Sequence, residues 1–126
     1  MSGTALLLDT DVLVDSLRGA RRLVAGDIAL AYSVVTLCEL FAGTDTDEGV
    51  VRVLLSPFTP IDVDVEIAER AGRIRRVTRL RTPDALIAAT AVVHGLALVT
   101  RNLRDFGRVT GLSLRDPESL RRDLSP

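Results

Sequence analysis

The chain is short of several residue types, and each shortage excludes a class of protein. All 16 basic residues are arginine, so mechanisms that require a lysine are excluded. A single cysteine, Cys38, rules out an internal disulfide and is typical of a reducing compartment. We expect it to be buried as a small apolar side chain. With no tryptophan, one tyrosine and three phenylalanines, the composition argues against an aromatic platform for stacking nucleobases.

Net charge and long apolar segments are also lacking. The formal net charge is −1, so any contact with nucleic acid must come from local basic patches. The longest uncharged run, residues 85–100, has 16 residues, whereas a membrane span needs about 20 predominantly apolar ones. The first residues lack the charged region and apolar core of a signal peptide. We therefore expect a soluble, cytoplasmic protein.

The chain does have many apolar residues, 47% of the total, arranged in short segments. This content suits one globular domain covering residues 1–126. Apolar runs predict strands at residues 5–8, 28–33, 96–99 and 112–114, with an extended piece between Pro57 and Pro60. Helices are predicted at residues 11–18, 35–42, 50–55, 65–80 and 83–94, and after Pro117. Strands that alternate with helices predict an α/β fold with a mostly parallel sheet, whose sites form at the carboxyl ends of strands.

Local signals place particular residues on these elements. Thr82 is expected to cap the helix that begins at Pro83, and Gly19 to close the first helix. The helix over residues 65–80 has apolar residues at helical spacing, so they should face the core: Ala68, Ala71, Ile74 and Val77.

Three carboxylates stand apart from the other acids because each adjoins or lies within an apolar segment. Asp9 ends an apolar run, so it is expected where the sheet meets solvent. Glu39 lies within residues 34–42, which are apolar nearly all round and predict a buried helix. Asp84 falls in the first turn of an alanine-rich helix, whose small side chains allow it to approach the sheet closely. The helix should bring Asp84 near Asp9.

Each acid also has an ordinary structural explanation. Asp9 could cap the next helix, as could Thr10 or Asp11. Glu39 could pair with an arginine, and Asp84 could stabilise the helix dipole from the surface. Together, however, three acids without sequence-local partners or a histidine partner predict a site for Mg²⁺ or Mn²⁺, which prefer oxygen ligands. Such ions lower the pKa of water and neutralise charge on a phosphoryl group during its transfer.

The motifs resemble those of PIN domains, in the family's order and over nearly the whole chain. Residues 7–15, Leu-Leu-Asp-Thr-Asp-Val-Leu-Val-Asp, resemble the opening strand, and residues 33–40 resemble the segment that carries the family's glutamate. Residues 84–91, followed by residues 95–106, resemble its most recognisable block. Small lone PIN domains of this size resemble VapC-type toxins.

The resemblance implies a PIN-like three-layer α/β/α fold with a mostly parallel sheet of four or five strands. It also implies an endoribonuclease that cleaves single-stranded regions of RNA, leaving 5′-phosphate and 3′-hydroxyl ends. Asp9, Glu39 and Asp84 would be catalytic and would bind Mg²⁺ or Mn²⁺. The implied partners are a VapB-type antitoxin and a second copy of the chain in a homodimer.

The fourth acidic position departs from the family pattern. Asn102 stands where many relatives have an acid, and Asp105 lies three residues later. Either residue could complete the catalytic set and hold a second metal ion through water, so one-metal and two-metal sites both stay open at this point. Asp11 replaces the commoner asparagine and adds a charge beside the site.

Other interpretations compete with this one. Residues 9–12 after an apolar strand also resemble haloacid-dehalogenase-type phosphatases, but that family and receiver domains need a downstream lysine. A catalytically weak PIN-like module that binds RNA or a partner is the remaining alternative, and metal-dependent turnover would separate the two. A basic region could be a solvated face or an RNA-backbone contact. It comprises Arg70, Arg73, Arg75, Arg76, Arg79 and Arg81, with Arg101, Arg104 and Arg108 farther along.

Overall fold

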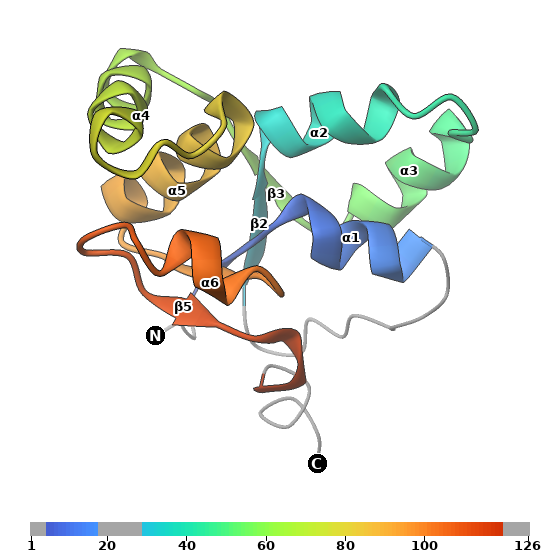
Figure 1. Ribbon diagram of the computed structural model, residues 1–126. Coiled ribbons are helices and arrows are strands. Elements are labelled where there is room, and N and C mark those ends of the chain that lie inside the picture. The colour runs from blue at the N-terminus through green and yellow to red at the C-terminus, as the bar shows by residue number, and fades with distance from the viewer. Residues whose placement is uncertain (1–4, 18–28, 120–126) are drawn as a thin grey trace.

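The computed structural model describes residues 5–17 and 29–119, in which helices cover both faces of a five-stranded sheet (Figure 1). The strands are β1 (Leu6–Leu8), β2 (Leu30–Ser33), β3 (Thr59–Ile61), β4 (Ala97–Val99) and β5 (Leu114–Arg115). Their order is β3-β2-β1-β4-β5, and every neighbouring pair is parallel. The predicted three-layer α/β fold is confirmed.

Six helices lie within the described residues. They are α1 (Thr10–Leu17), α2 (Val34–Phe41), α3 (Glu48–Leu55), α4 (Val65–Thr78), α5 (Thr82–His94) and α6 (Leu103–Phe106). In Figure 1, α4 and α5 lie on one side of β2 and β3, and α1 and α3 lie on the other. No helix in the described part of the chain is long and apolar enough to cross a membrane.

The central strand β1 is buried on both faces. Leu7 packs in the core formed with α4 and α5, whereas Leu6 and Leu8 pack in a second core with α1 and α3. All three leucines are at most 1% exposed. Because successive side chains of a strand point to opposite faces, a strand covered on both sides is apolar at every position. This burial explains the uninterrupted apolar run that predicted the strand.

The order of the strands determines where a site can form. From β1 the chain proceeds through β2 to β3 on one side, and then returns to place β4 on the other side of β1. The direction of winding therefore reverses between β1 and β4. A crevice forms at such a reversal, outside the carboxyl ends of the strands. Asp9 follows β1 and Thr100 follows β4, so both residues lie at this crevice.

A tight turn joins α4 to α5 and fixes where α5 begins. Arg79 adopts a left-handed conformation, with φ of 63°, which ends α4. The Nε of Arg75 donates a hydrogen bond to the carbonyl of Leu80 at 2.9 Å, and Thr78 Oγ1 accepts one from the Leu80 amide at 3.1 Å. The N-cap of α5 is Arg81, so the prediction of Thr82 as the cap was wrong by one position. The early Pro83 preorganises the first turn.

Two burial predictions were wrong. Helix α2 is not buried all round: only Thr36 and Leu40 are buried, and Cys38 is exposed. The helix lies beyond the end of β2 in Figure 1, so only part of its surface meets the core. On α4, Ala71 and Ile74 are buried as expected. Ala68 and Val77, which were also predicted to face the core, are exposed. The buried row is Ile67, Ala71, Ile74 and Thr78 rather than one including Ala68 and Val77.

Several predicted boundaries of helices and strands differ from those of the structure, and others lie outside the described residues. Helix α3 begins at Glu48, with Asp47 as its N-cap, two residues before the predicted start. The last strand occupies Leu114–Arg115 rather than residues 112–114, and α6 was not predicted. The predicted end of the first helix at Gly19 lies outside the described residues. Residues 117–119 begin a helical turn, and the rest of that predicted helix is also outside the described part.

Candidate active site

Asp9 lies where the chain leaves β1 and begins α1. Its amide donates a hydrogen bond to the carbonyl of Val99 at 2.9 Å, which extends the pairing of β1 with β4. Its carbonyl accepts hydrogen bonds from the amides of Val12 and Leu13 in α1. The residue is only 6% exposed. Strand and helix thus fix its backbone from both sides.

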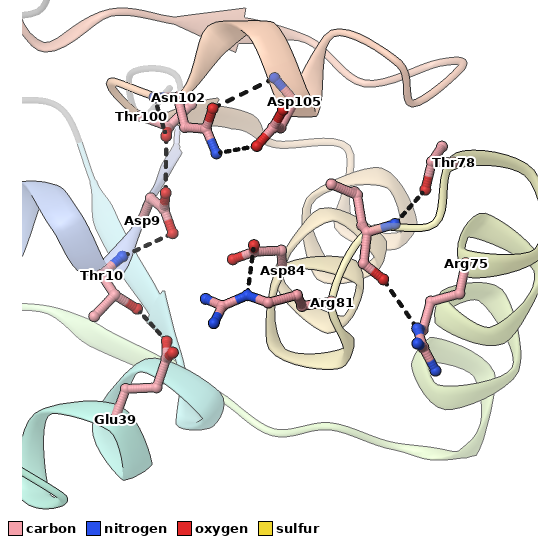
Figure 2. A network of polar contacts seen from close by, with 11 residues as sticks. Asp9, Thr10, Glu39, Arg75, Thr78, Arg81, Asp84, Thr100, Asn102 and Asp105 are labelled. Carbon is pink, nitrogen blue, oxygen red and sulfur yellow. Dashed lines mark hydrogen bonds and ion pairs between the residues drawn. The ribbon is translucent and has the colours of Figure 1, made fainter.

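Two donors hold the carboxylate of Asp9 (Figure 2). The Oγ1 of Thr100 donates to Asp9 Oδ2 at 2.8 Å, and the amide of Thr10 donates to Oδ1 at 2.8 Å. Thr100 Oγ1 also accepts a hydrogen bond from the amide of Asn102 at 3.0 Å. Asp9 forms no ion pair with any residue that the structure describes. Its orientation is therefore set by neutral donors.

The surroundings of Asp9 disfavour its charge. Burial raises the pKa of Asp9 from 3.8 to about 6, and repulsion from Asp11 and Asp84 contributes to the rise. The hydrogen bonds from Thr100 and from the backbone at Thr10 oppose the rise without cancelling it. A buried carboxylate of this kind would be stabilised by a cation, and strongly shifted groups in a crevice are candidates for function.

Glu39 reaches the same site from α2. The Oγ1 of Thr10 donates to Glu39 Oε1 at 2.7 Å and lies 3.0 Å from Thr36 Oγ1. Thr10 thus links the two predicted acids, since its amide contacts Asp9 and its hydroxyl contacts Glu39. Within the described residues Glu39 makes no ion pair with an arginine, the alternative explanation for its position.

Asp84 faces these acids from the first turn of α5. Its side chain is 21% exposed, and its Oδ2 lies 3.8 Å from the Nε of Arg81, which is itself 78% exposed. Burial raises the pKa of Asp84, the charge of Arg81 opposes the rise, and repulsion from Glu39 and Asp105 adds to it. Asp84 therefore interacts electrostatically with Glu39 of α2, with Asp105 of α6 and with Asp9. Its only described ion pair is long and open to solvent.

Asn102 and Asp105 form a single polar unit at the start of α6. Asn102 Nδ2 donates to Asp105 Oδ2 at 3.1 Å, and the amide of Asp105 donates back to Asn102 Oδ1 at 3.4 Å. On the other side, Arg108 lies 3.7 Å from Asp105 Oδ1. The two candidates for the fourth position are therefore hydrogen-bonded to each other. The amide of Asn102 also donates to Thr100, which in turn donates to Asp9.

Asp11 lies beside the site in a different arrangement. Arg101 lies 3.9 Å from Asp11 Oδ2 and 3.1 Å from Asp15 Oδ2. Burial raises the pKa of Asp11 and the charge of Arg101 lowers it. The Oδ1 of Asp11 is buried and has no hydrogen-bond partner among the described atoms. Arg101 thus offsets part of the extra charge noticed in the sequence, while burial keeps the pKa of Asp11 raised.

The five predicted site residues come together from four elements and their flanks. In Figure 2, Asp9, Glu39, Asp84, Asn102 and Asp105 surround one space. Within residues 5–17 and 29–119, however, no three acids, histidines or cysteines are close enough to form a complete set of metal ligands. The sequence argument considered Thr10 only as a possible helix cap and assigned no role to Thr36 and Thr100. Their only signal was the position of Thr10 and Thr100 just beyond strand ends.

Comparison with known proteins identifies the family. The family model of the PIN domain matches residues 6–112. Ribonuclease VapC10 of Mycobacterium tuberculosis is 43% identical over 113 residues, covering 80% of this chain and 85% of the relative. This chain belongs to the VapC-type ribonucleases of the PIN-domain family. The tRNA(fMet)-specific endonuclease VapC of Salmonella typhimurium is 34% identical over 98 residues, or 69% of this chain and 74% of that protein.

A solved structure supports the same membership. A toxin–antitoxin complex from Klebsiella pneumoniae contains a chain that is 38% identical, with a TM-score of 0.73. The match covers 85% of this chain and 94% of that one. The VapC-type ribonuclease predicted from the sequence is therefore confirmed as the family, and the haloacid-dehalogenase interpretation is wrong.

Proposed function

We propose that this VapC-type chain cleaves RNA with an Mg²⁺ or Mn²⁺ ion bound by Asp9 and Asp84, with Glu39 binding the ion or orienting its water. The observation that carries the proposal is the state of Asp9. It is 6% exposed, its pKa is raised to about 6, and the carboxylate of Asp84 faces it and repels its charge. A divalent ion would relieve this repulsion.

The donors suit such an ion in their chemistry. Asp9, Glu39 and Asp84 offer only carboxylate oxygens, which Mg²⁺ and Mn²⁺ prefer to nitrogen or sulfur. Asp84 is held loosely, by an exposed ion pair of 3.8 Å, so its carboxylate can move toward Asp9. Asp105 and Asn102 would contribute at the edge of the site, through water or as ligands of a second ion.

The residues of the chain prepare the site for in-line attack by water on a phosphodiester. When bound, a divalent ion lowers the pKa of water and neutralises charge on the phosphoryl group. Thr100 and the Thr10 amide fix the direction of both Asp9 oxygens. The Thr10 hydroxyl donates a hydrogen bond to Glu39, which in this proposal binds the ion or orients its water. Asp84, at the positive end of α5, remains ionised more readily than burial alone would allow.

Metal-dependent turnover tests this function against that of a non-cutting PIN-like binding module. Purified chain should cleave RNA with Mg²⁺ or Mn²⁺ and stop in EDTA. The Asp84→Asn variant should lose nearly all cleavage, while the exposed Asp62→Asn variant should keep it.

Stability gives a second test. In EDTA, the Asp84→Asn variant should be as stable as wild type or more so, because one repelling charge is gone. Added Mg²⁺ should raise the Tm of wild type more than that of the variant. Full RNA cleavage in excess chelator would contradict the metal mechanism.

We also propose that a VapB-type antitoxin binds the chain, that the chain forms a homodimer, and that it acts in the cytoplasm. The support for the antitoxin is the likeness to the Klebsiella pneumoniae chain solved in a toxin–antitoxin complex. The homodimer and the cytoplasm are proposed from the membership of the VapC-type family. Co-expression with a VapB-type antitoxin should relieve growth arrest caused by the chain and yield a complex on purification. Light scattering on the chain alone should give twice the mass of 13.6 kDa. A monomer at micromolar concentration would contradict the homodimer but leave the nuclease proposal intact.

A further inference from the structure

An arginine-lined groove lies outside the acidic site. It lies between α4, the second half of α5 and the turn that follows α6, and has a volume of about 290 Å³. Arg70 and Arg73 line it from α4, and Arg108 lines it from the turn. No acidic side chain in the described residues lines this groove. Three positive charges therefore share one concave surface on a chain whose net charge is −1.

The guanidinium of Arg70 marks this groove as more than a solvated face. Its Nε is buried and has no hydrogen-bond partner among the described atoms. A buried donor without a partner is costly, so such groups are usually satisfied by protein, water or a ligand. Neighbouring arginines are different: Arg75 donates its Nε proton to the Leu80 carbonyl, and Arg76 is exposed.

The groove adjoins the acidic site through Arg108. This residue lines the groove and also lies 3.7 Å from Asp105 Oδ1. Val92, on the floor of the groove, follows Asp84 by eight residues in α5, which corresponds to about 12 Å along the helix axis. A polymer bound at Asp84 can therefore continue into the groove within a few repeating units.

We propose that this groove binds a backbone phosphate of the RNA substrate, a few nucleotides from the bond that is cut. The inference rests on the proposed nuclease function, because it assumes an RNA strand across the acidic site. Arginine suits phosphate because its planar fork donates two parallel hydrogen bonds. Val77, Val92 and Val109 add apolar surface on which a ribose or base can lie. A short arginine-lined groove thus replaces the aromatic platform that the composition lacks.

The test compares two exposed arginines of α4, one in the groove and one outside it. Binding of a fluorescently labelled 12-nucleotide single-stranded RNA is measured by anisotropy in EDTA, so the result does not depend on cleavage. Arg73→Gln should raise Kd about fivefold near physiological salt and reduce the salt slope by about 0.7, as expected for one lost phosphate contact on a single strand. Arg76→Gln should stay within twofold of wild type.

Two further measurements sharpen the test. With Mg²⁺ or Mn²⁺ present, Arg73→Gln should raise KM and leave kcat unchanged, because a remote phosphate contact is the same in ground and transition states. Arg70→Lys keeps the charge but removes the planar fork, and should also weaken RNA binding. Thermal melts verify that each variant is folded. If Arg70→Lys does not fold, the comparison of Arg73 with Arg76 still decides.

Each outcome separates the groove from the nuclease proposal. Equal losses for Arg73→Gln and Arg76→Gln would indicate diffuse surface charge and overturn the groove. Unchanged RNA affinity together with weaker binding of a poly-glutamate peptide would assign the groove to an acidic protein segment, which also overturns the proposal. The Arg73→Gln variant could lose RNA affinity while the wild-type protein still cleaves RNA in excess chelator. That pair of results would support the groove and contradict the metal mechanism.

Discussion

Asp9, at the end of β1, and Asp105, in α6, both belong to the same acidic site, but their surroundings differ. Asp9 is 6% exposed, ends the central strand and receives hydrogen bonds from two residues. The Asp105 side chain is 44% exposed and belongs to a helix of four residues, where it contacts Asn102 and Arg108. In the proposed site, the strand end would therefore fix the central acid, whereas α6 would adjust the charge around it. Substitutions on the two sides should therefore differ greatly in their effects.

The largest effect is expected from Asp9→Asn. This change keeps the shape of the side chain but removes the charge of a proposed metal ligand, so cleavage should fall about a thousandfold. Single-turnover cleavage of RNA in saturating Mg²⁺ measures it. Asp62→Asn removes the same charge from an exposed position and should have no effect. An Asp9→Asn enzyme within tenfold of wild type would contradict the central role of the strand end.

A pH effect should follow from the raised pKa of Asp9. With EDTA present, native Asp9 binds its proton at about pH 6, whereas the unfolded chain binds it near 3.8. This group's contribution to stability is therefore fully present below pH 3.8 and is lost as pH rises through 6. The full difference is about 3 kcal/mol by order of magnitude. Urea unfolding at pH 7.5 and 5.0 should show a smaller gain on acidification in Asp9→Asn than in wild type.

Metal binding should have the opposite pH dependence, since the proton and the ion compete for the same carboxylate. Affinity for Mg²⁺ should therefore decrease as pH falls through about 6. Titration calorimetry at the two pH values measures this change. If affinity were constant across the interval while Asp9→Asn lost binding, the raised pKa of Asp9 would be wrong.

The sequence predicted the strands of the sheet and the positions of the acids on the elements, because both depend on local patterns. A strand buried on both faces shows as an apolar run, and Asp9 and Asp84 follow directly from a strand end and a helix start. The contacts that orient the acids were not predictable in this way. Thr100 and Asp9 are 91 positions apart, and Thr10 and Glu39 are 29 apart. No local pattern reports a hydrogen bond that depends on how β1, β4 and α2 meet.

The exposure of α2 was missed for a related reason. Its apolar composition gives the same pattern whether the helix lies under a sheet or beyond its end, and only the fold distinguishes them. Cys38 was accordingly expected inside and lies outside. The left-handed Arg79 was also unpredictable, since this conformation usually belongs to glycine. It sets the start of α5 and with it the position of Asp84.

An intermediate effect is expected from Thr100→Val. The change removes the donor to Asp9 Oδ2 and leaves the Asn102 amide without its acceptor. Metal affinity should fall about tenfold, because that factor corresponds to the free energy that one hydrogen bond to a charged group contributes. Thr90→Val is the matched control, because its buried hydroxyl bonds only to the Leu86 carbonyl within α5. Both variants should lose some stability, but only Thr100→Val should lose Mg²⁺ affinity in calorimetry.

The smallest effect is expected on the α6 side. Asp105→Asn should weaken metal binding about threefold, as for the loss of a partly exposed charge that acts through water. Asn102→Ala should have a smaller effect on binding if Asp105 supplies the fourth charge. Cleavage at limiting Mn²⁺ measures both variants. Equal and negligible effects would show that Asp9, Glu39 and Asp84 suffice, and would make the contrast between the two sides complete.

The central position of β1 has a consequence for how the protein is made. This strand precedes the other described strands in the chain, yet it pairs with β4, whose last residue is Val99. Until the segment around Val99 and Thr100 has left the ribosome, Asp9 lacks the strand and the hydroxyl that orient it. A nascent chain should therefore have no oriented Asp9 until β4 has emerged, and stalled chains ending before β4 should leave RNA intact.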